Sequence, residues 1–315
     1  MYFINPLIVV GIHISFLVTG ILGNLFILIV NFHNWLKTQD FNPSMLIINS
    51  IAIIDIFLQG AIVFHVVTNF LFLEFYIQAW VVKPLVAILI SLTFSSLWCS
   101  TCLCFYYCIK IVNIGGSFYY KLKARFPVFV PWILITSIAT SWLVGLPIYW
   151  DLYMDIRPLT DLTAANVTLI FTATIKSRCE CIFQTYNLLA GVTLAAILVT
   201  AGAIVISLCK HMIRMKKNSE GSGNSRLRSH LSATKTVTSL LLQYLIFYGF
   251  LSSIFIELDN PGGFIFLFSF IVVSTFPTLN SMILITGNRK LSNSLKKLLG
   301  VRAHTANTEV TVTTY

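Results

Sequence analysis

The chain has 315 residues, and its composition excludes an ordinary soluble protein. Hydrophobic residues make up 57% of the chain and charged residues only 10%, against about 45–50% and about 25% in soluble domains. The net charge is +10, but the charged residues are confined to short segments between long apolar runs. We therefore do not expect nucleic acid as a partner, and we predict one polytopic membrane domain.

Seven apolar runs are long enough to cross a membrane. A hydrocarbon core of about 30 Å needs about 20 apolar residues in a helix. In lipid each isolated segment must satisfy its own backbone hydrogen bonds, so each run is predicted to be a helix. The predicted spans are 7–32, 44–70, 85–112, 127–149, 184–209, 236–257 and 263–286. This pattern indicates an all-α membrane protein, a seven-transmembrane helix bundle.

The third run carries small polar residues that a helix surrounded by lipid does not need. They are Ser91, Thr93, Ser95, Ser96, Ser100 and Thr101. Small polar residues are typical of helices that pack closely against several neighbours. We therefore expect the third span to be the central strut of the bundle.

The orientation follows from the Lys and Arg residues. Of the 21 in the chain, only Lys83, Arg157, Lys176 and Arg178 fall in the loops of one side. The positive-inside rule then predicts an extracellular N-terminus and a cytosolic C-terminus. The sequon Asn166-Val-Thr168 lies in a predicted outer loop, so Asn166 is a candidate glycosylation site.

The segment after the seventh span has the pattern of a short amphipathic helix. Leucines at 291, 295, 298 and 299 alternate with polar and basic residues over 289–299. We predict a cytosolic helix that lies on membrane lipids. The membrane domain then occupies residues 1–300, and residues 301–315 are predicted to be a disordered cytosolic tail.

Asp55 lies near the middle of the second span, where an acidic residue is costly and faces the bundle interior. Asn24 in the first span and Asn280 in the seventh lie at similar depth and are its predicted partners in a polar core. Two interpretations stay open: a network that fixes helix packing, or a sodium or proton site that biases two states. Pro277 is predicted to bend the seventh span.

The remaining chemistry is sparse. Cys179 and Cys181 fall in an outer loop, where disulfides can form, but we expect them to be too close in sequence to pair with each other. No cysteine pair has zinc-ligand spacing, and neither His-Glu-x-x-His nor Gly-x-Ser-x-Gly occurs. We therefore expect no catalytic residue, metal or cofactor, and a protein that is not an enzyme.

Three blocks resemble the bitter taste receptor family (taste receptor type 2), a family of G-protein-coupled receptors. They are Trp98-x-x-Thr101-Cys-Leu-x-x-Tyr106-Tyr107-x-x-Lys110-Ile111; Ser207-Leu-x-Lys-His211-x-x-x-Met215 with His230-x-x-Ala-x-Lys235; and Pro277-x-x-Asn280-Ser281-x-x-Leu284. Many members have Arg where Asp55 stands and His where Asn280 stands. The resemblance therefore points to a divergent member of the family.

The resemblance implies a plasma-membrane receptor that binds small bitter tastants between the outer halves of spans three, five, six and seven. On the third span, Leu89, Thr93 and Ser96 share one helical face and are candidate ligand contacts. The implied partner is a gustducin-like heterotrimeric G protein, with phospholipase C and calcium downstream. Candidate coupling or switch residues are Tyr107, Lys110, His211, His230 and Lys235.

Two alternative functions stay open. A vomeronasal type 1 pheromone receptor would share the architecture, although the Tyr106-Tyr107-x-x-Lys110 block and the block at His230 favour the taste family. A small-molecule transporter would show broken helices, often in two related halves, and several ionisable residues within the membrane. The chain has no internal repeat. The sequence does not identify the agonist and leaves open whether the receptor forms an oligomer.

Overall fold

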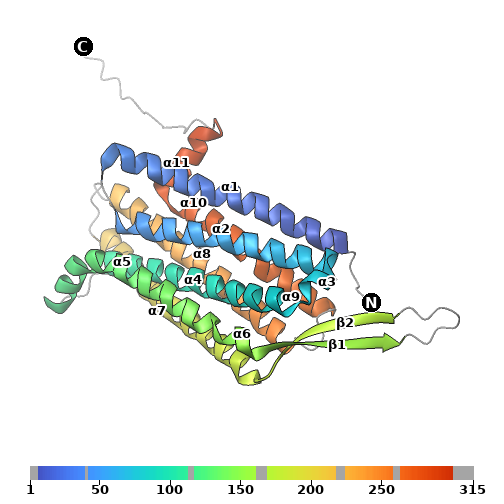
Figure 1. Ribbon diagram of the computed structural model, residues 1–315. Helices are drawn as coiled ribbons and strands as arrows, with labels where there is room; N and C mark the ends of the chain where they lie inside the picture. Colours follow the sequence, from blue (N-terminus) through green and yellow to red (C-terminus); the bar gives the residue numbers. More distant parts are fainter. Residues whose placement is uncertain are drawn as a thin grey trace, which may run out of the picture.

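The computed structural model describes residues 6–39, 42–112, 117–160, 169–217, 224–257 and 263–300. Within these ranges, seven helical stretches are long and apolar enough to cross a membrane. They run side by side in an elongated bundle (Figure 1). The predicted all-α, seven-span membrane protein is therefore confirmed.

The helices follow the predicted spans with small shifts at their ends. They are α1 Pro6–Thr38, α2 Pro43–Leu71, α3 Leu73–Tyr76, α4 Ala79–Ile111, α5 Ser117–Gly145, α6 Pro147–Asp151, α7 Glu180–Lys217, α8 Asn224–Ile256, α9 Phe264–Ser274, α10 Phe276–Gly287 and α11 Arg289–Leu298. The third span begins at Ala79 rather than 85. Lys83 and Pro84 interrupt the apolar run, but the helix continues through Pro84, which cannot donate to the carbonyl of Trp80.

Helix α4 is the central strut that the sequence predicts. It packs against α2, α5 and α7, and also touches α8. Five of its six small polar side chains are buried, and three of these donate to carbonyls of their own helix: Ser91 to Ala87 at 2.8 Å, Ser95 to Ser91 at 2.8 Å and Thr101 to Leu97 at 2.9 Å. Because these three hydroxyls are satisfied within α4, they allow close packing without exposing polar groups to lipid.

The seventh span consists of two helices, α9 and α10, separated at Thr275. Pro277 lies at the start of α10, where its missing N–H leaves no backbone donor for the preceding turn. The backbone of Thr275 instead donates to Val272 at 3.1 Å. The predicted distortion of this span at Pro277 is confirmed.

A β-hairpin follows α6 and was not predicted from the sequence. Strands β1 Leu152–Thr160 and β2 Leu169–Ser177 pair antiparallel and project beyond the bundle (Figure 1). The β-branched and aromatic residues of 169–175 were the available signal. Asn166 lies between the strands, outside the described residues. We call the end of the bundle that carries this hairpin the hairpin end.

The base of the hairpin is fixed by Asp151. Its carboxylate accepts the backbone N–H of Cys179 at 3.0 Å and the hydroxyl of Ser177. Cys179 and Cys181 form a disulfide, with their Cα atoms 5.1 Å apart. The expectation that these two cysteines are too close to pair is wrong, because the chain turns into α7 here and brings the Cα atoms within the usual range for a disulfide.

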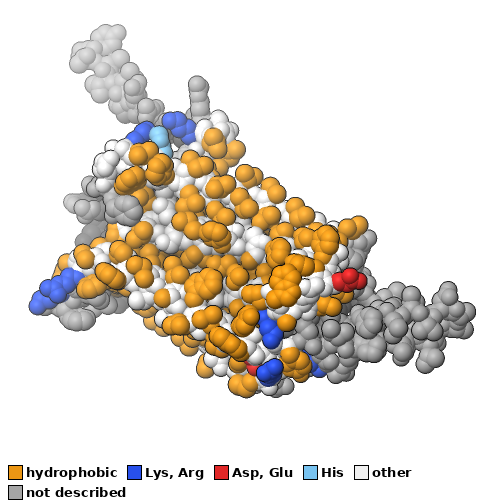
Figure 2. Space-filling model, viewed as in Figure 1, with side chains coloured by type: hydrophobic (Ala, Val, Ile, Leu, Met, Phe, Trp, Pro, Cys, Tyr) orange, Lys and Arg blue, Asp and Glu red, His pale blue; other side chains and the backbone are white. Residues whose placement is uncertain are grey.

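Helix α11 confirms the predicted amphipathic helix after the seventh span. Asn288 caps it by accepting the backbone N–H of Lys290 at 3.0 Å. Leu291 is fully buried against the bundle, whereas Leu298 and Leu299 are exposed. The predicted tail 301–315 lies outside the described residues. Figure 2 shows hydrophobic side chains along the length of the helices and charged side chains toward the two ends, as expected of a membrane-spanning bundle.

Candidate functional site

A cavity of about 260 Å³ opens among the helices at the hairpin end. Helices α2, α4, α7, α8 and α9 form its walls, and α3 and the start of β1 cover part of it. The family resemblance implied contributions from spans three, five, six and seven. The wall from α2 is additional, because the short helix α3 folds the chain back over the bundle between α2 and α4.

The walls of this cavity are mainly aromatic. The rings that line it are Phe70, Tyr76, Phe94, Phe183, Tyr186, Phe255, Phe266 and Phe270. Several pack against each other: the centroids of Phe183 and Phe255 lie 5.4 Å apart, and those of Phe94 and Tyr186 lie 5.9 Å apart. Such pairs stabilise the walls, so the cavity is a preformed feature of the fold.

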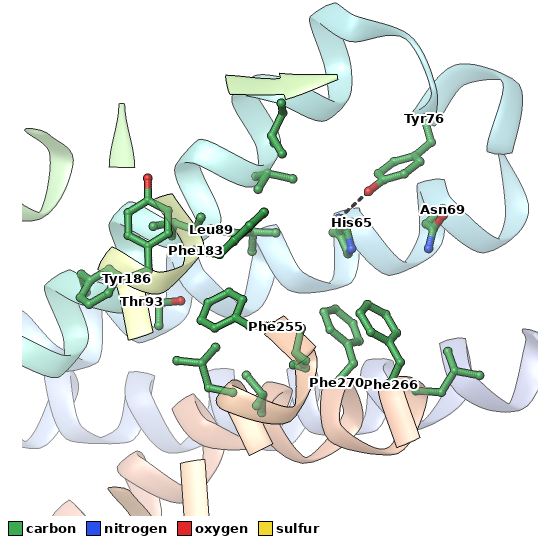
Figure 3. Close-up of a pocket in the computed structure, with 18 of the residues that line it drawn as sticks. His65, Asn69, Tyr76, Leu89, Thr93, Phe183, Tyr186, Phe255, Phe266 and Phe270 are labelled. Atoms are coloured by element: carbon green, nitrogen blue, oxygen red, sulfur yellow. Dashed lines mark hydrogen bonds between the residues drawn. The ribbon is translucent and has the colours of Figure 1, made fainter. Parts of the chain in front are cut away.

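Few polar groups face the cavity (Figure 3). On the α2 side, the Tyr76 hydroxyl lies 3.4 Å from His65 Nδ1, and Asn69 lies one turn further along α2. Burial raises the pKa of the Tyr76 hydroxyl well above its ordinary value, so this group stays protonated. Tyr186 turns its hydroxyl away from the cavity, because it donates to the Val144 carbonyl at 3.0 Å.

The three candidate ligand contacts on the third span do not share one environment. Leu89 and Thr93 line the cavity, and Thr93 is labelled in Figure 3. Ser96 is not among the described residues that line it; its hydroxyl donates to Asp55 Oδ1 at 2.6 Å. A ligand role for any of these residues stays a prediction, but only Leu89 and Thr93 are in place to meet a molecule in the cavity.

Asp55 is the centre of a buried polar cluster that joins three helices. Its side chain is 0% exposed, and it accepts hydrogen bonds from Ser96 of α4 at 2.6 Å and Asn280 Nδ2 of α10 at 2.9 Å. Asn24 of α1 is also fully buried, but its amide has no hydrogen-bond partner among the described residues. The structure therefore brings Asp55 and Asn280 together, while Asn24 stands apart from their hydrogen bonds.

A second polar connection was missed by sequence reasoning. Gln59, one turn after Asp55 on α2, donates to Thr278 Oγ1 of α10 at 2.7 Å, and Thr278 donates to the carbonyl of Phe16 in α1 at 3.0 Å. Gly20 makes room for it, because a Cβ there would coincide with the amide of Gln59. An intramembrane glutamine at helical spacing from Asp55 was the available signal.

The candidate coupling residues lie at the opposite end of the bundle. Lys110 is exposed at the end of α4, with its Nζ 5.7 Å from the centroid of the Tyr106 ring. Tyr107 is half-buried and Lys235 of α8 is exposed. His211 and His230 belong to α7 and α8 respectively, but their side chains lie outside the described residues.

These features define the class of the protein. A seven-helix membrane bundle with an aromatic cavity at one end, a polar cluster at its centre and a short amphipathic helix after the last span has the architecture of a G-protein-coupled receptor.

Comparison with known proteins gives the family. The family model of taste receptor proteins (TAS2R) matches residues 1–302, and the chain belongs to this family. Taste receptor type 2 member 9 of Pongo pygmaeus is 29% identical over 90% of this chain and 90% of its own length. Member 1 of Chlorocebus aethiops is 30% identical over 89% and 91%, and member 2 of Homo sapiens is 26% identical over 89% and 92%.

Membership in this family makes the protein a bitter taste G-protein-coupled receptor embedded in a membrane. The resemblance inferred from the three sequence blocks is confirmed. The match over nearly the whole chain favours neither the pheromone-receptor nor the transporter alternative. Receptors of this family in general recognise small molecules and act through a G protein. The aromatic cavity is therefore the candidate binding site for a small molecule.

Proposed function

We propose that the receptor binds small bitter agonists in the aromatic cavity and activates a gustducin-like heterotrimeric G protein at the opposite end of the bundle. Phospholipase C and calcium signals follow. The observation that carries this proposal is the cavity itself, a preformed aromatic chamber of about 260 Å³ in a chain of the taste receptor family. Leu89 and Thr93 are its proposed contacts from α4.

In this proposal the receptor lies in the plasma membrane with the hairpin end outside the cell. The distribution of Lys and Arg supports this orientation, since most of them belong to the loops and helix ends opposite the hairpin. The sequon at Asn166 belongs to the segment between β1 and β2, and glycosylation there would require the same orientation.

The link between cavity and G protein runs through α8. The Tyr244 hydroxyl lies 3.5 Å from the carbonyl of Leu97, a residue that lines the cavity. Gln243 donates to the carbonyl of Phe276 at 2.9 Å, and the Phe247 ring lies 4.7 Å from the Phe276 ring. These contacts hold α8 against α4 and against the break in the seventh span. A ligand that favours an arrangement in which they are broken would release α8.

Displacement of α8 would expose groups at the opposite end of the bundle to the G protein. The proposed coupling or switch residues are Tyr107, Lys110, His211, His230 and Lys235. They belong to the ends of α4, α7 and α8 that lie opposite the hairpin, where we propose that a helix of the G protein α subunit inserts. The basic side chains of Lys110 and Lys235 suit an acidic or carboxyl-terminal segment of that subunit.

The test is a calcium assay in cells that carry a promiscuous G protein α subunit with a gustducin-like tail. We expect some bitter compounds to give a response that requires this subunit and is lost in Lys110→Ala and His230→Ala variants. Lys83→Ala, at the hairpin end, is the matched control and should respond normally. Surface labelling must show that all variants reach the plasma membrane.

The assay tests the receptor function and the coupling residues separately. A response that survives both substitutions would retain the receptor function and refute the coupling residues. No response to a broad set of bitter compounds, with the receptor present at the surface and a control receptor active in the same cells, would contradict signalling through this G protein.

A further inference from the structure

The cavity offers no ionic partner to a ligand. Among the described residues that line it, none is Asp, Glu, Lys or Arg. A carboxylate or ammonium group that enters must give up hydration without gaining a countercharge, which strongly disfavours its binding. The carboxylates of Asp55 and Asp151 are already engaged: Asp55 accepts from Ser96 and Asn280, and Asp151 accepts from the base of the hairpin.

Aromatic rings can bind cations through their faces, so the arrangement of these rings matters. Here the rings pack against each other rather than converge on one point. Phe266 and Phe270 lie nearly parallel, at 3°, with centroids 6.5 Å apart, and His65 packs on Phe270 with its centroid 5.5 Å away. Such paired rings present a flat apolar surface to a planar ligand. They do not form a cage in which several ring faces surround an ammonium group.

The volume limits the size of the ligand. A cavity of 260 Å³ compares with about 150 Å³ for an engineered protein cavity that binds benzene. The space therefore suits about two fused rings, on the order of ten non-hydrogen atoms by that comparison. A larger molecule would have to extend toward the mouth of the cavity.

Two polar groups are available at opposite sides of the aromatic walls. In Figure 3, Thr93 lies at one side of the cavity and Asn69, next to His65, at the other. Neither the Thr93 hydroxyl nor the Asn69 amide makes a hydrogen bond with another described residue. Both line the cavity and are only partly buried. Each can therefore donate to or accept from a ligand atom.

We infer that the cavity selects uncharged, planar, bicyclic aromatic ligands with a hydrogen-bonding group at each end, one for Thr93 and one for Asn69. The aromatic walls supply apolar contact, and the two polar groups set the orientation. The inference rests on the proposed function, because it names the ligand class of the same cavity.

The test uses three probes with one ring system: 6-hydroxy-2-naphthamide, which is neutral, 6-hydroxy-2-naphthoate, an anion, and (6-hydroxy-2-naphthyl)methylammonium, a cation. Binding to the full-length receptor purified in detergent is measured by calorimetry at neutral pH. We expect the amide to bind on the order of 100-fold more tightly than either ion. Removing its 6-hydroxyl should weaken binding by about three- to tenfold.

Three variants test the site: one removes the polar anchor at Thr93, one is its control, and one fills the cavity. Thr93→Val keeps the shape of the side chain and removes the hydroxyl, so we expect an affinity loss of about three- to tenfold for the amide. Thr136→Val is the matched control, because Thr136 is exposed on α5 and its hydroxyl donates only to carbonyls of its own helix. Leu89→Trp should fill the cavity and abolish binding.

Equal affinity for the three probes, or no binding of the amide, would overturn the inference. So would calcium responses in cells to the charged probes and none to the neutral one, although the receptor function would then stand. Conversely, selective binding of the amide without a calcium response would support the ligand class and contradict the proposed signalling.

Discussion

Replacing Ser96 with alanine should destabilise the receptor by removing a hydrogen-bond donor from a buried carboxylate. The Ser96 hydroxyl lies 2.6 Å from Asp55 Oδ1, and both side chains are 0% exposed. Water cannot reach the position that the hydroxyl vacates without rearrangement of the helices. Asp55 Oδ1 would therefore lose its side-chain donor, while Oδ2 would keep the bond from Asn280.

The magnitude follows from the type of bond. Hydrogen bonds to charged groups contribute about 1.5–3 kcal/mol, whereas hydrogen bonds between membrane helices average about 0.6 and reach about 1.7 kcal/mol. For a serine that donates to a fully buried carboxylate we expect about 1.5–2 kcal/mol, at the upper end of the membrane range. The corresponding fall in Tm is about 3–8 °C.

The neighbouring residue provides the control. Ser95 is also buried on α4, but its hydroxyl donates to the Ser91 carbonyl of its own helix at 2.8 Å. That carbonyl keeps its backbone partner when the hydroxyl is removed, so Ser95→Ala should cost less than about 0.5 kcal/mol. The two variants remove the same atom from adjacent positions and differ only in what the hydroxyl contacts.

The assay is thermal unfolding followed with a thiol-reactive fluorescent dye. Cys99, Cys102 and Cys104 are buried in α4 and become reactive only when the bundle opens. Equal Tm values for Ser96→Ala and Ser95→Ala would refute the reasoning, because the bond to Asp55 would then contribute nothing that an ordinary helix hydroxyl does not.

Three further changes test other parts of the bundle. Asp55→Asn keeps the shape of the side chain and can hydrogen-bond to both Ser96 and Asn280, so Tm should stay equal or rise and become independent of sodium and pH. A lower Tm of this variant in sodium buffer would show that a bound sodium ion stabilises the carboxylate of the parent protein. Gly287→Ala would place a Cβ 2.8 Å from the Cβ of Thr236 in α8 and should destabilise the receptor by about 1–3 kcal/mol. Gly60→Ala is the control and should not destabilise it, because the space around Gly60 is open. Equal Tm values for the two variants would argue against tight packing between α8 and α10. Gln59→Leu removes the donor to Thr278 and should lower Tm by about 2–4 °C, and an unchanged Tm would exclude a structural role for this bond.

The fold was largely predictable because membrane helices depend on local composition. A run of apolar residues must satisfy its backbone hydrogen bonds within itself, so each span is visible in the sequence. The β-hairpin was not predicted, because the pairing of Leu152 with Ser177 joins segments that are far apart in the chain. Such pairing depends on the turn and on the anchor at Asp151, and neither has a strong local pattern.

The candidate site was predictable only in part. Helical periodicity shows that Leu89, Thr93 and Ser96 share one face of the helix, but it does not show how far along the helix the cavity extends. Ser96 lies three residues beyond Thr93, about 4.5 Å further along the axis, which is enough to leave the cavity and reach Asp55. The contribution of α2 was also hidden, since it depends on how α3 returns the chain toward α4.

The cavity and the polar cluster meet on α4, and this position gives a physical route by which a ligand could act. Leu97 lines the cavity, while its carbonyl accepts the hydroxyl of Tyr244 from α8. The neighbouring residue Ser96 donates a hydrogen bond to Asp55, which also accepts one from Asn280 of α10. A ligand that contacts Leu97 differently in two arrangements of the bundle would bias both sets of bonds at once. Because a ligand can shift the equilibrium only by its difference in affinity for the two arrangements, the apolar contacts around Leu97 must supply that difference.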